Sequence, residues 1–289
     1  MKEAYIDIGE LDFSIRLSAY MNWLKDQGRQ AALVMTYPGR KCLYEDRVEK
    51  VIDVPKEFYE DFDIEQQCGS RIGLCDRSVE EEYQRKFIDY FNGKLPEGYR
   101  VSGDMEFVQP FSRMTNYRSF LFTPYPYREK LTGKKEILVL PRCRRAAPYS
   151  ERNLSKMFYI KLINRLCDNF GSYIVRTMGL KGASYDITEV KKDNYINFVG
   201  KTANLQKVID RCQVAVGAIG SHSTPLVFTM LQGVPSFLIG KDRERVEKNN
   251  WSNTKFYFVN TGSWHFAGWA DEKEHDKAIN EAILFFKEC

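Results

Sequence analysis

Apolar segments of strand length alternate with amphipathic segments of helix length almost without exception through the second half of this chain. Residues 136–140, 173–177 and 214–219 are short apolar runs, whereas residues 150–170 place apolar side chains at helical spacing. Strands that alternate with helices build a parallel sheet, because each helix returns the chain to the edge where the next strand begins. We therefore predict a doubly wound α/β fold for this half. The other expected strands and helices of this half are 196–199, 204–212, 225–232, 236–239, 256–259 and 271–287.

The first half of the chain opens with the same kind of unit. Residues 4–8 are expected to form a strand, residues 12–26 a helix that Asp12 caps, and residues 31–36 and 48–54 two further strands. Strand, helix and strand in this order again indicate a parallel sheet.

The pattern weakens after another expected helix at residues 80–91. Tyr, Pro, Gly and Arg dominate much of residues 96–134, which we interpret as the rest of a first domain and a linker. The sequence therefore predicts two α/β domains, residues 1–132 and 133–289, with a cleft between them.

Composition and charge exclude several classes of protein. The 289-residue chain is 43% hydrophobic, and no segment reaches the roughly 18 consecutive apolar residues of a membrane span. The start of the chain does not have the pattern of a signal peptide, and its seven cysteines and three histidines lack the spacing of a zinc site. A net charge of +4 suits anionic ligands without indicating a nucleic-acid partner. We expect a cytoplasmic protein with no metal site and no transmembrane segment, and peripheral contact with a membrane stays compatible with the sequence.

A polar cluster interrupts the apolar stretch Val214–Gly240. Residues 220–225 follow an expected strand and precede an expected helix, with Pro225 at the first helical position and Thr224 as the N-cap. Helix N-terminal amides and nearby hydroxyls bind phosphate, and glycine lets a ligand approach the backbone. The alternative is an ordinary turn whose hydroxyls only cap the helix. The candidate phosphate-binding residues are Gly220, Ser221, His222, Ser223 and Thr224.

A basic loop is expected on the same edge of the predicted sheet. Arg142, Arg144 and Arg145 follow the first strand of the second half, and a planar guanidinium offers two parallel donors to a phosphate. A solvated surface loop is the alternative for these arginines.

Two carboxylates follow the first expected strand of the chain. Glu10 and Asp12 lie in the loop Gly9–Asp12, at the carboxyl edge of the first predicted sheet. A carboxylate there can serve as a general base that removes a proton from an attacking hydroxyl. The alternative for Asp12 is the capping role given above.

A distinctive set of residues occurs along the segment 196–240: Gly200-Lys201-Thr202, Leu205, Ser223, Pro225 and Gly233-Val234-Pro235. In order and spacing, these residues resemble the donor-side domain of glycosyltransferase family 9, the heptosyltransferase family. The opening loop and helix also resemble those of the family, and Asp12 falls on the position of its proposed catalytic acidic residue.

This resemblance implies a GT-B fold, in which two Rossmann-like domains face a central cleft. The C-terminal domain would bind a nucleoside-diphosphate sugar, with Lys201 and Thr202 among the donor residues, and the N-terminal domain would bind the acceptor. The implied activity is transfer of the sugar to an acceptor hydroxyl, on a glycan, a glycolipid or another molecule, with inversion and without a metal or other cofactor. The terminal helix can cross back to brace the first domain.

The sequence departs from the family at three donor-pocket positions. His222, Thr224 and Val227 stand where the family has Asp, Gly and His. A donor other than ADP-heptose is therefore expected. Two alternatives stay open at this point: a GT-B sugar-nucleotide epimerase or hydrolase, and a non-catalytic nucleotide-sugar-binding protein.

Overall fold

The chain divides into two compact units. They span Met1–Thr123 and Pro124–Cys289, whereas the sequence indicated a boundary between residues 132 and 133. The computed structural model describes residues 1–7, 11–55, 57, 88–102, 124–143, 153–201, 205–221, 223–240, 254–258 and 272–289. Most of the helix expected at 80–91 lies outside these residues.

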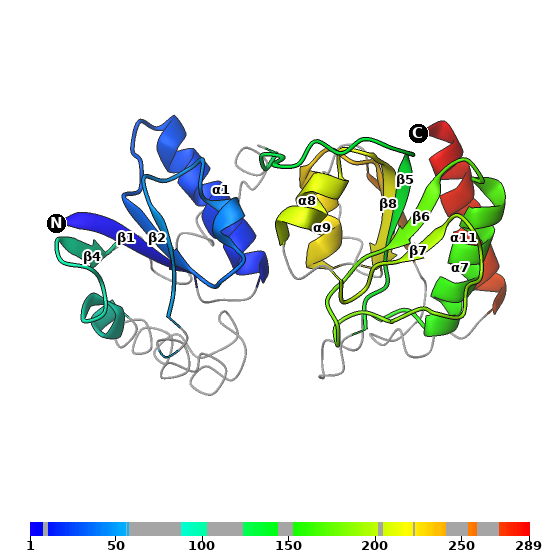
Figure 1. The fold of residues 1–289 in the computed structure, drawn as a ribbon, viewed down its shortest axis with the longest axis horizontal. Helices are drawn as coiled ribbons and strands as arrows, with labels where there is room; N and C mark the ends of the chain where they lie inside the picture. The colour runs from blue at the N-terminus through cyan, green and yellow to red at the C-terminus, as the bar shows by residue number, and fades with distance from the viewer. Residues whose placement is uncertain are drawn as a thin grey trace. The chain divides into compact units, whose positions relative to one another are not determined.

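The first unit contains a four-stranded parallel sheet in the order β3-β2-β1-β4 (Figure 1). Helix α1 follows β1 and packs with Leu17, Met21 and Leu24 buried, at the spacing of residues that share one face of a helix. The short strand β4 was not predicted, because three residues are too few to show a period. The elements are β1 (Lys2–Asp7), α1 (Leu11–Asp26), β2 (Leu33–Thr36), the 3₁₀-helix η1 (Lys41–Leu43), β3 (Val51–Asp53) and β4 (Tyr99–Val101).

The second unit contains a six-stranded parallel sheet in the order β10-β9-β8-β5-β6-β7. The chain starts in the centre at β5, moves outward through β6 and β7, and then returns to the other side of β5 with β8. This is the order of a doubly wound nucleotide-binding sheet. The elements are β5 (Glu136–Leu140), α7 (Lys156–Asn169), β6 (Ile174–Thr177), β7 (Tyr195–Asn197), α8 (Leu205–Arg211), β8 (Ala215–Ser221), α9 (Thr224–Leu231), β9 (Ser236–Gly240), β10 (Thr254–Phe258) and α11 (Glu272–Glu288).

Helices cover both faces of this second sheet. Helices α7 and α11 lie on one face and α8 and α9 on the other (Figure 1). Successive side chains of β5 alternate between the two layers: Ile137 and Val139 pack under α7 and α11, whereas Leu138 and Leu140 pack under α8 and α9. The prediction of Rossmann-like, doubly wound units is therefore confirmed.

Three differences from the predicted helix starts concern the start of α7 and the N-caps of α9 and α1. Helix α7 starts at Lys156 instead of residue 150, because the Ser155 side chain accepts a hydrogen bond from the Phe158 N–H and caps the helix there. Helix α9 starts at Thr224, which makes Ser223 its N-cap. Asp12 lies in the first turn of α1 and is not its N-cap.

A buried ion cluster closes the amino edge of the second sheet. Arg176 of β6 donates two hydrogen bonds, both of 2.7 Å, to the Glu136 carboxylate at the start of β5. Arg211, which ends α8, adds a third at 2.9 Å. These two arginines neutralise a carboxylate on the edge opposite the expected ligand crevice, so their role is to hold the sheet together.

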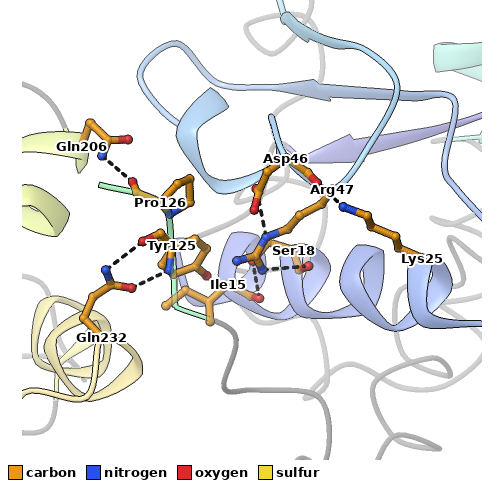
Figure 2. Close-up of polar contacts among 9 residues, drawn as sticks. All are labelled: Ile15, Ser18, Lys25, Asp46, Arg47, Tyr125, Pro126, Gln206 and Gln232. Carbon is orange, nitrogen blue, oxygen red and sulfur yellow. Dashed lines mark hydrogen bonds and ion pairs between the residues drawn. The ribbon is translucent and has the colours of Figure 1, made fainter. Parts of the chain in front are cut away.

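The extended segment that opens the second unit is bound to α8 and α9 through its main chain (Figure 2). The Gln232 amide, just after α9, accepts from the Tyr125 N–H at 2.5 Å and donates to the Tyr125 carbonyl at 3.0 Å. Gln206 of α8 donates to the Pro126 carbonyl at 2.9 Å. Two further side chains bind the segment, Asp210 at the Arg128 N–H (2.8 Å) and Gln213 at the Glu129 carbonyl.

Replacing Gln232 with Met is expected to destabilise the second unit by about 2–4 kcal/mol, because two buried main-chain groups of Tyr125 lose their partner. Urea unfolding followed by circular dichroism measures this. The matched control is Gln213→Met, whose bond to the Glu129 carbonyl is exposed and is replaced by water, at a cost below about 0.5 kcal/mol. Equal losses of stability in the two variants would contradict the role of Gln232 in binding the Tyr125 main chain.

Candidate functional site

The candidate ligand site of the second unit is the region outside the carboxyl ends of β5 and β8, which we call the crevice because doubly wound sheets bind ligands in a crevice at this point. These strands are neighbours, but the chain leaves them toward opposite sides of the sheet, so the loops that follow them diverge. Ligands of doubly wound sheets bind at such a switch point. Gly220 pairs with Leu140 at its rim, and a Cβ atom on Gly220 would lie 3.0 Å from the Leu140 carbonyl oxygen. Glycine at this position therefore lets the two strand ends lie close together.

Helix α9 begins at this crevice with an unused capping group. The Ser223 side chain is 6% exposed, makes no capping hydrogen bond, and its hydroxyl has no partner among the described residues. The amides of a first helical turn have no acceptor within the helix, and Pro225 has no N–H at all. A buried hydroxyl, main-chain amides and the positive end of the helix dipole thus meet at one point, which is a suitable environment for an anion.

Ser221, the last residue of β8, is fully buried beside a tyrosine from α7. The Tyr159 hydroxyl reaches the Leu140 carbonyl oxygen at 3.4 Å and lies next to Ser221. Burial raises the pKa of Tyr159 far above its ordinary value, so the phenol is neutral at physiological pH. Ser221 therefore contacts Tyr159 on the α7 side of the sheet, whereas Ser223 lies at the start of α9.

The main chain after β5 is fixed by the loop that follows β6. The Cys143 N–H donates to the Ala183 carbonyl at 2.9 Å, and the Tyr185 N–H donates to the Pro141 carbonyl at 2.8 Å. Arg142 forms a β-bridge with Ser184 between these two bonds. The structure thus fixes the backbone of Arg142 next to the switch point, whereas Arg144 and Arg145 lie outside the described residues.

The other predicted donor residues are placed differently. Lys201 lies after β7, three strands from β8, which corresponds to about 14 Å along the sheet. Its Nζ atom donates to the Asn197 carbonyl at 3.1 Å, so the structure does not bring it to the crevice. Thr224 contributes its backbone to the first turn of α9, and Thr202 and His222 lie outside the described residues.

A polar cluster also occupies the carboxyl edge of the first sheet. Asp7, at the end of β1, is fully buried and accepts hydrogen bonds from three hydroxyls. Arg40 places its guanidinium 3.5 Å from the same carboxylate. Burial raises the pKa of Asp7, against the opposing effects of Arg40 and the three hydroxyls. The hydroxyl donors are Ser14 (2.9 Å), Thr36 (2.7 Å) and Tyr44 (2.8 Å).

Sequence reasoning missed this cluster because its members are scattered between residues 7 and 44. One signal was present: a carboxylate at position 7 interrupts the apolar residues of the strand expected at 4–8, and a carboxylate that is buried in a sheet needs a partner. The predicted bases lie close by in the sequence. The backbone of Asp12 is in the first turn of α1, and Glu10 lies outside the described residues.

Within the described part of the chain, no group of three or more His, Cys, Asp or Glu side chains is arranged to hold a metal ion. No described helix is both long and apolar enough to cross a membrane.

Solved structures of glycosyltransferases match this chain over nearly its whole length. E. coli ADP-heptose LPS heptosyltransferase II shares 16% identity at a TM-score of 0.56, with 100% of both chains covered. A glycosyltransferase family 9 protein of Veillonella parvula shares 12% at 0.59, with 98% of this chain and 97% of that chain covered. The E. coli heptosyltransferase WaaC, in a structure with ADP, shares 10% at 0.55, with 97% and 99% covered. No family model and no curated protein matches the sequence.

These likenesses establish the fold. The chain has the GT-B architecture of two Rossmann-like units, as the sequence resemblance predicted.

Replacing Gly220 with Ala tests the close approach at the crevice. The added methyl meets the Leu140 backbone, which cannot move without separating β5 from β8, so we expect a loss of about 1–3 kcal/mol in urea unfolding. Gly171→Ala is the control, because a Cβ atom there has nothing within 4 Å and should leave stability within about 1 kcal/mol of wild type. Wild-type stability of Gly220→Ala would mean that the strand ends lie further apart.

Proposed function

We propose that this protein is a glycosyltransferase that moves a sugar from a nucleoside-diphosphate sugar to an acceptor hydroxyl. The observation that carries the proposal is the buried Ser223 hydroxyl, which has no hydrogen-bond partner among the described residues and lies at the N-terminus of α9, beside the switch point of a doubly wound sheet. The GT-B fold, shared with heptosyltransferases over the full chain, supports a nucleotide sugar as the ligand.

The second unit would hold the donor through its diphosphate. The Ser223 hydroxyl and the first-turn amides of α9 donate hydrogen bonds to phosphate oxygens, and the α9 dipole favours their negative charge. Arg142, fixed after β5, would supply a positive charge on the opposite side of the crevice. These groups stabilise the charge that develops on the leaving diphosphate as the glycosidic bond breaks, which is the task a metal ion would otherwise perform.

Further donor contacts are proposed for residues that the sequence singled out. Arg144 and Arg145 would extend the basic loop. His222, just before α9, and Thr224, its first residue, would add contacts to the donor, and Ser221 and Gly220 would shape the floor of the site. Lys201 and Thr202 would serve the donor only if their loop moves toward the crevice, because Lys201 lies three strands away.

The first unit would supply the acceptor site and the base. Asp12 in the first turn of α1, or Glu10 just before it, would accept the proton of the acceptor hydroxyl as its oxygen attacks the anomeric carbon. A single displacement of this kind inverts the configuration at that carbon. The acceptor class that suits the proposal is a glycan or glycolipid, handled in the cytoplasm.

The donor is proposed to differ from ADP-heptose, although one matched heptosyltransferase structure carries ADP. His222, Thr224 and Val227 depart from the family pattern close to the N-terminus of α9. These departures change the charge and size of the pocket where a donor sugar would lie.

Thermal-shift titration with UDP-glucose, UDP-N-acetylglucosamine, GDP-mannose, dTDP-rhamnose, ADP-glucose and ADP-heptose tests the proposal. A ligand that binds the native state raises the melting temperature with concentration. At least one donor, and its free nucleoside diphosphate, should stabilise the protein. A lack of stabilisation by all of them would contradict a nucleotide-sugar site.

Two serine substitutions separate ligand binding from stability. Ser223→Ala removes a buried hydroxyl that has no partner in the described part of the chain. The free protein should therefore be as stable as wild type or more so, while the Kd of the bound nucleotide rises about tenfold. Ser155→Ala removes a working N-cap from α7, which should cost about 1 kcal/mol and leave the nucleotide Kd unchanged. The assignment of Ser223 fails if its substitution leaves the Kd at the wild-type value.

A further inference from the structure

The Asp7 cluster connects four parts of the first unit at the edge where an acceptor would bind. Its members come from the end of β1, the first turn of α1, the end of β2 and the segment around η1. All of its hydroxyl contacts to the carboxylate measure 2.7–2.9 Å. Groups of the protein itself therefore satisfy this carboxylate.

One of these contacts fixes α1 directly. The Ser14 hydroxyl donates to Asp7 Oδ1 at 2.9 Å, and both side chains are fully buried. Ser14 lies two residues after Asp12, in the first residues of the same helix. This bond therefore ties the start of α1, and the backbone of Asp12 with it, to the end of β1.

Arg40 sets the direction of this bond. Its NH1 atom donates to Ser14 Oγ at 2.7 Å and lies 3.5 Å from Asp7 Oδ1. Because Arg40 donates to the Ser14 oxygen, the Ser14 hydroxyl hydrogen is left to point at Asp7. The Tyr44 hydroxyl, within 3.1 Å of the Ser14 carbonyl oxygen, supports the same turn from its other side.

We propose that Asp7 and Ser14 are a positioning pair for the glycosyl-transfer reaction. They hold the first turn of α1 in place, so that the carboxylate of Asp12 or of Glu10 meets the acceptor hydroxyl in a fixed geometry. Neither residue touches a substrate. This inference rests on the proposed function, and it accounts for the presence of a carboxylate, which can accept several hydrogen bonds at once, at the buried end of β1.

The cluster offers a matched pair of substitutions. Ser14→Ala and Thr36→Val each remove one hydroxyl bond to the Asp7 carboxylate, from a fully buried residue, but only Ser14 belongs to α1. A merely structural role predicts similar consequences for both. A positioning role predicts that only Ser14→Ala disturbs the helix start and the reaction.

Hydrogen exchange followed by mass spectrometry measures the first difference, on the full chain without ligand. Ser14→Ala should speed exchange of the amides at residues 15–18 about fivefold or more relative to those of β1, and Thr36→Val should leave them within about twofold of wild type. Equal protection of these amides in wild type and Ser14→Ala would overturn the proposal.

The second measurement is the release of nucleoside diphosphate with water as the acceptor. Its substrate is the nucleotide sugar that stabilises the protein most in the thermal-shift titration. Ser14→Ala should lower kcat about tenfold or more with the donor KM within about twofold, because a misplaced base slows the reaction without weakening the donor site. Thr36→Val should keep kcat within about twofold of wild type. Equal kcat values for the two variants would overturn the positioning role.

The two proposals fail in different ways. If no donor binds the wild-type protein, the proposed function is wrong, and so is the role of the pair in transfer. The difference in hydrogen exchange between Ser14→Ala and Thr36→Val would still show whether Asp7 stabilises the start of α1. If donors bind and turn over but Ser14→Ala behaves like wild type, only the positioning role is lost.

Discussion

The parallel pairing of β5 with β8 is the constraint on which the second unit depends. It joins the first strand of the unit to a strand that returns from the far side of the sheet, so it creates both the switch point and the division of helices between the two faces. Two glycines of β8 make this arrangement fit. Gly220 allows the close approach to Leu140, and Gly217 leaves room for the Phe286 ring, which would lie 2.4 Å from a Cβ atom there. One strand thus admits a neighbouring strand at its carboxyl end and a helix against its middle.

The carboxyl edges of the two sheets carry different kinds of polar groups. At the edge of the first sheet, the Asp7 carboxylate contacts three hydroxyls and one guanidinium of the protein itself. At the second, the Ser223 hydroxyl is buried without a described partner. A satisfied cluster holds its shape on its own, whereas an unsatisfied one gains from a ligand. This contrast agrees with the proposal that the first edge orients reacting groups and the second binds a charged substrate.

Sequence reasoning predicted much of the fold because alternating strands and helices leave a strong local pattern. Nearly all predicted strands and helices of the second half are present with bounds that differ by one or two residues. Helix α7 differs more, because Ser155 caps it and it starts at Lys156 instead of residue 150. The candidate site was less accessible. Three features of the site depend on strand order. Ser223 lies at the switch point without a described partner, and Lys201 lies three strands away. Asp7 contacts Ser14, Thr36 and Tyr44, which are distant from it in the sequence. Strand order is set by long-range packing, which local periodicity does not encode.

The binding of the segment around Tyr125 to α8 and α9 changes how the chain should be divided in practice. Because Gln232, Gln206 and Asp210 bind the main chain of residues 125–128, that segment is part of the second unit even though it carries no helix or strand. A fragment that starts at residue 133 would expose the buried ring of Phe228, against which Tyr125 packs. It would also leave the side chains of Gln232, Gln206 and Asp210 without their main-chain hydrogen-bond partners in residues 125–128. A fragment that starts at Pro124 retains all of these contacts, and it is the natural boundary for grafting this unit onto another first domain.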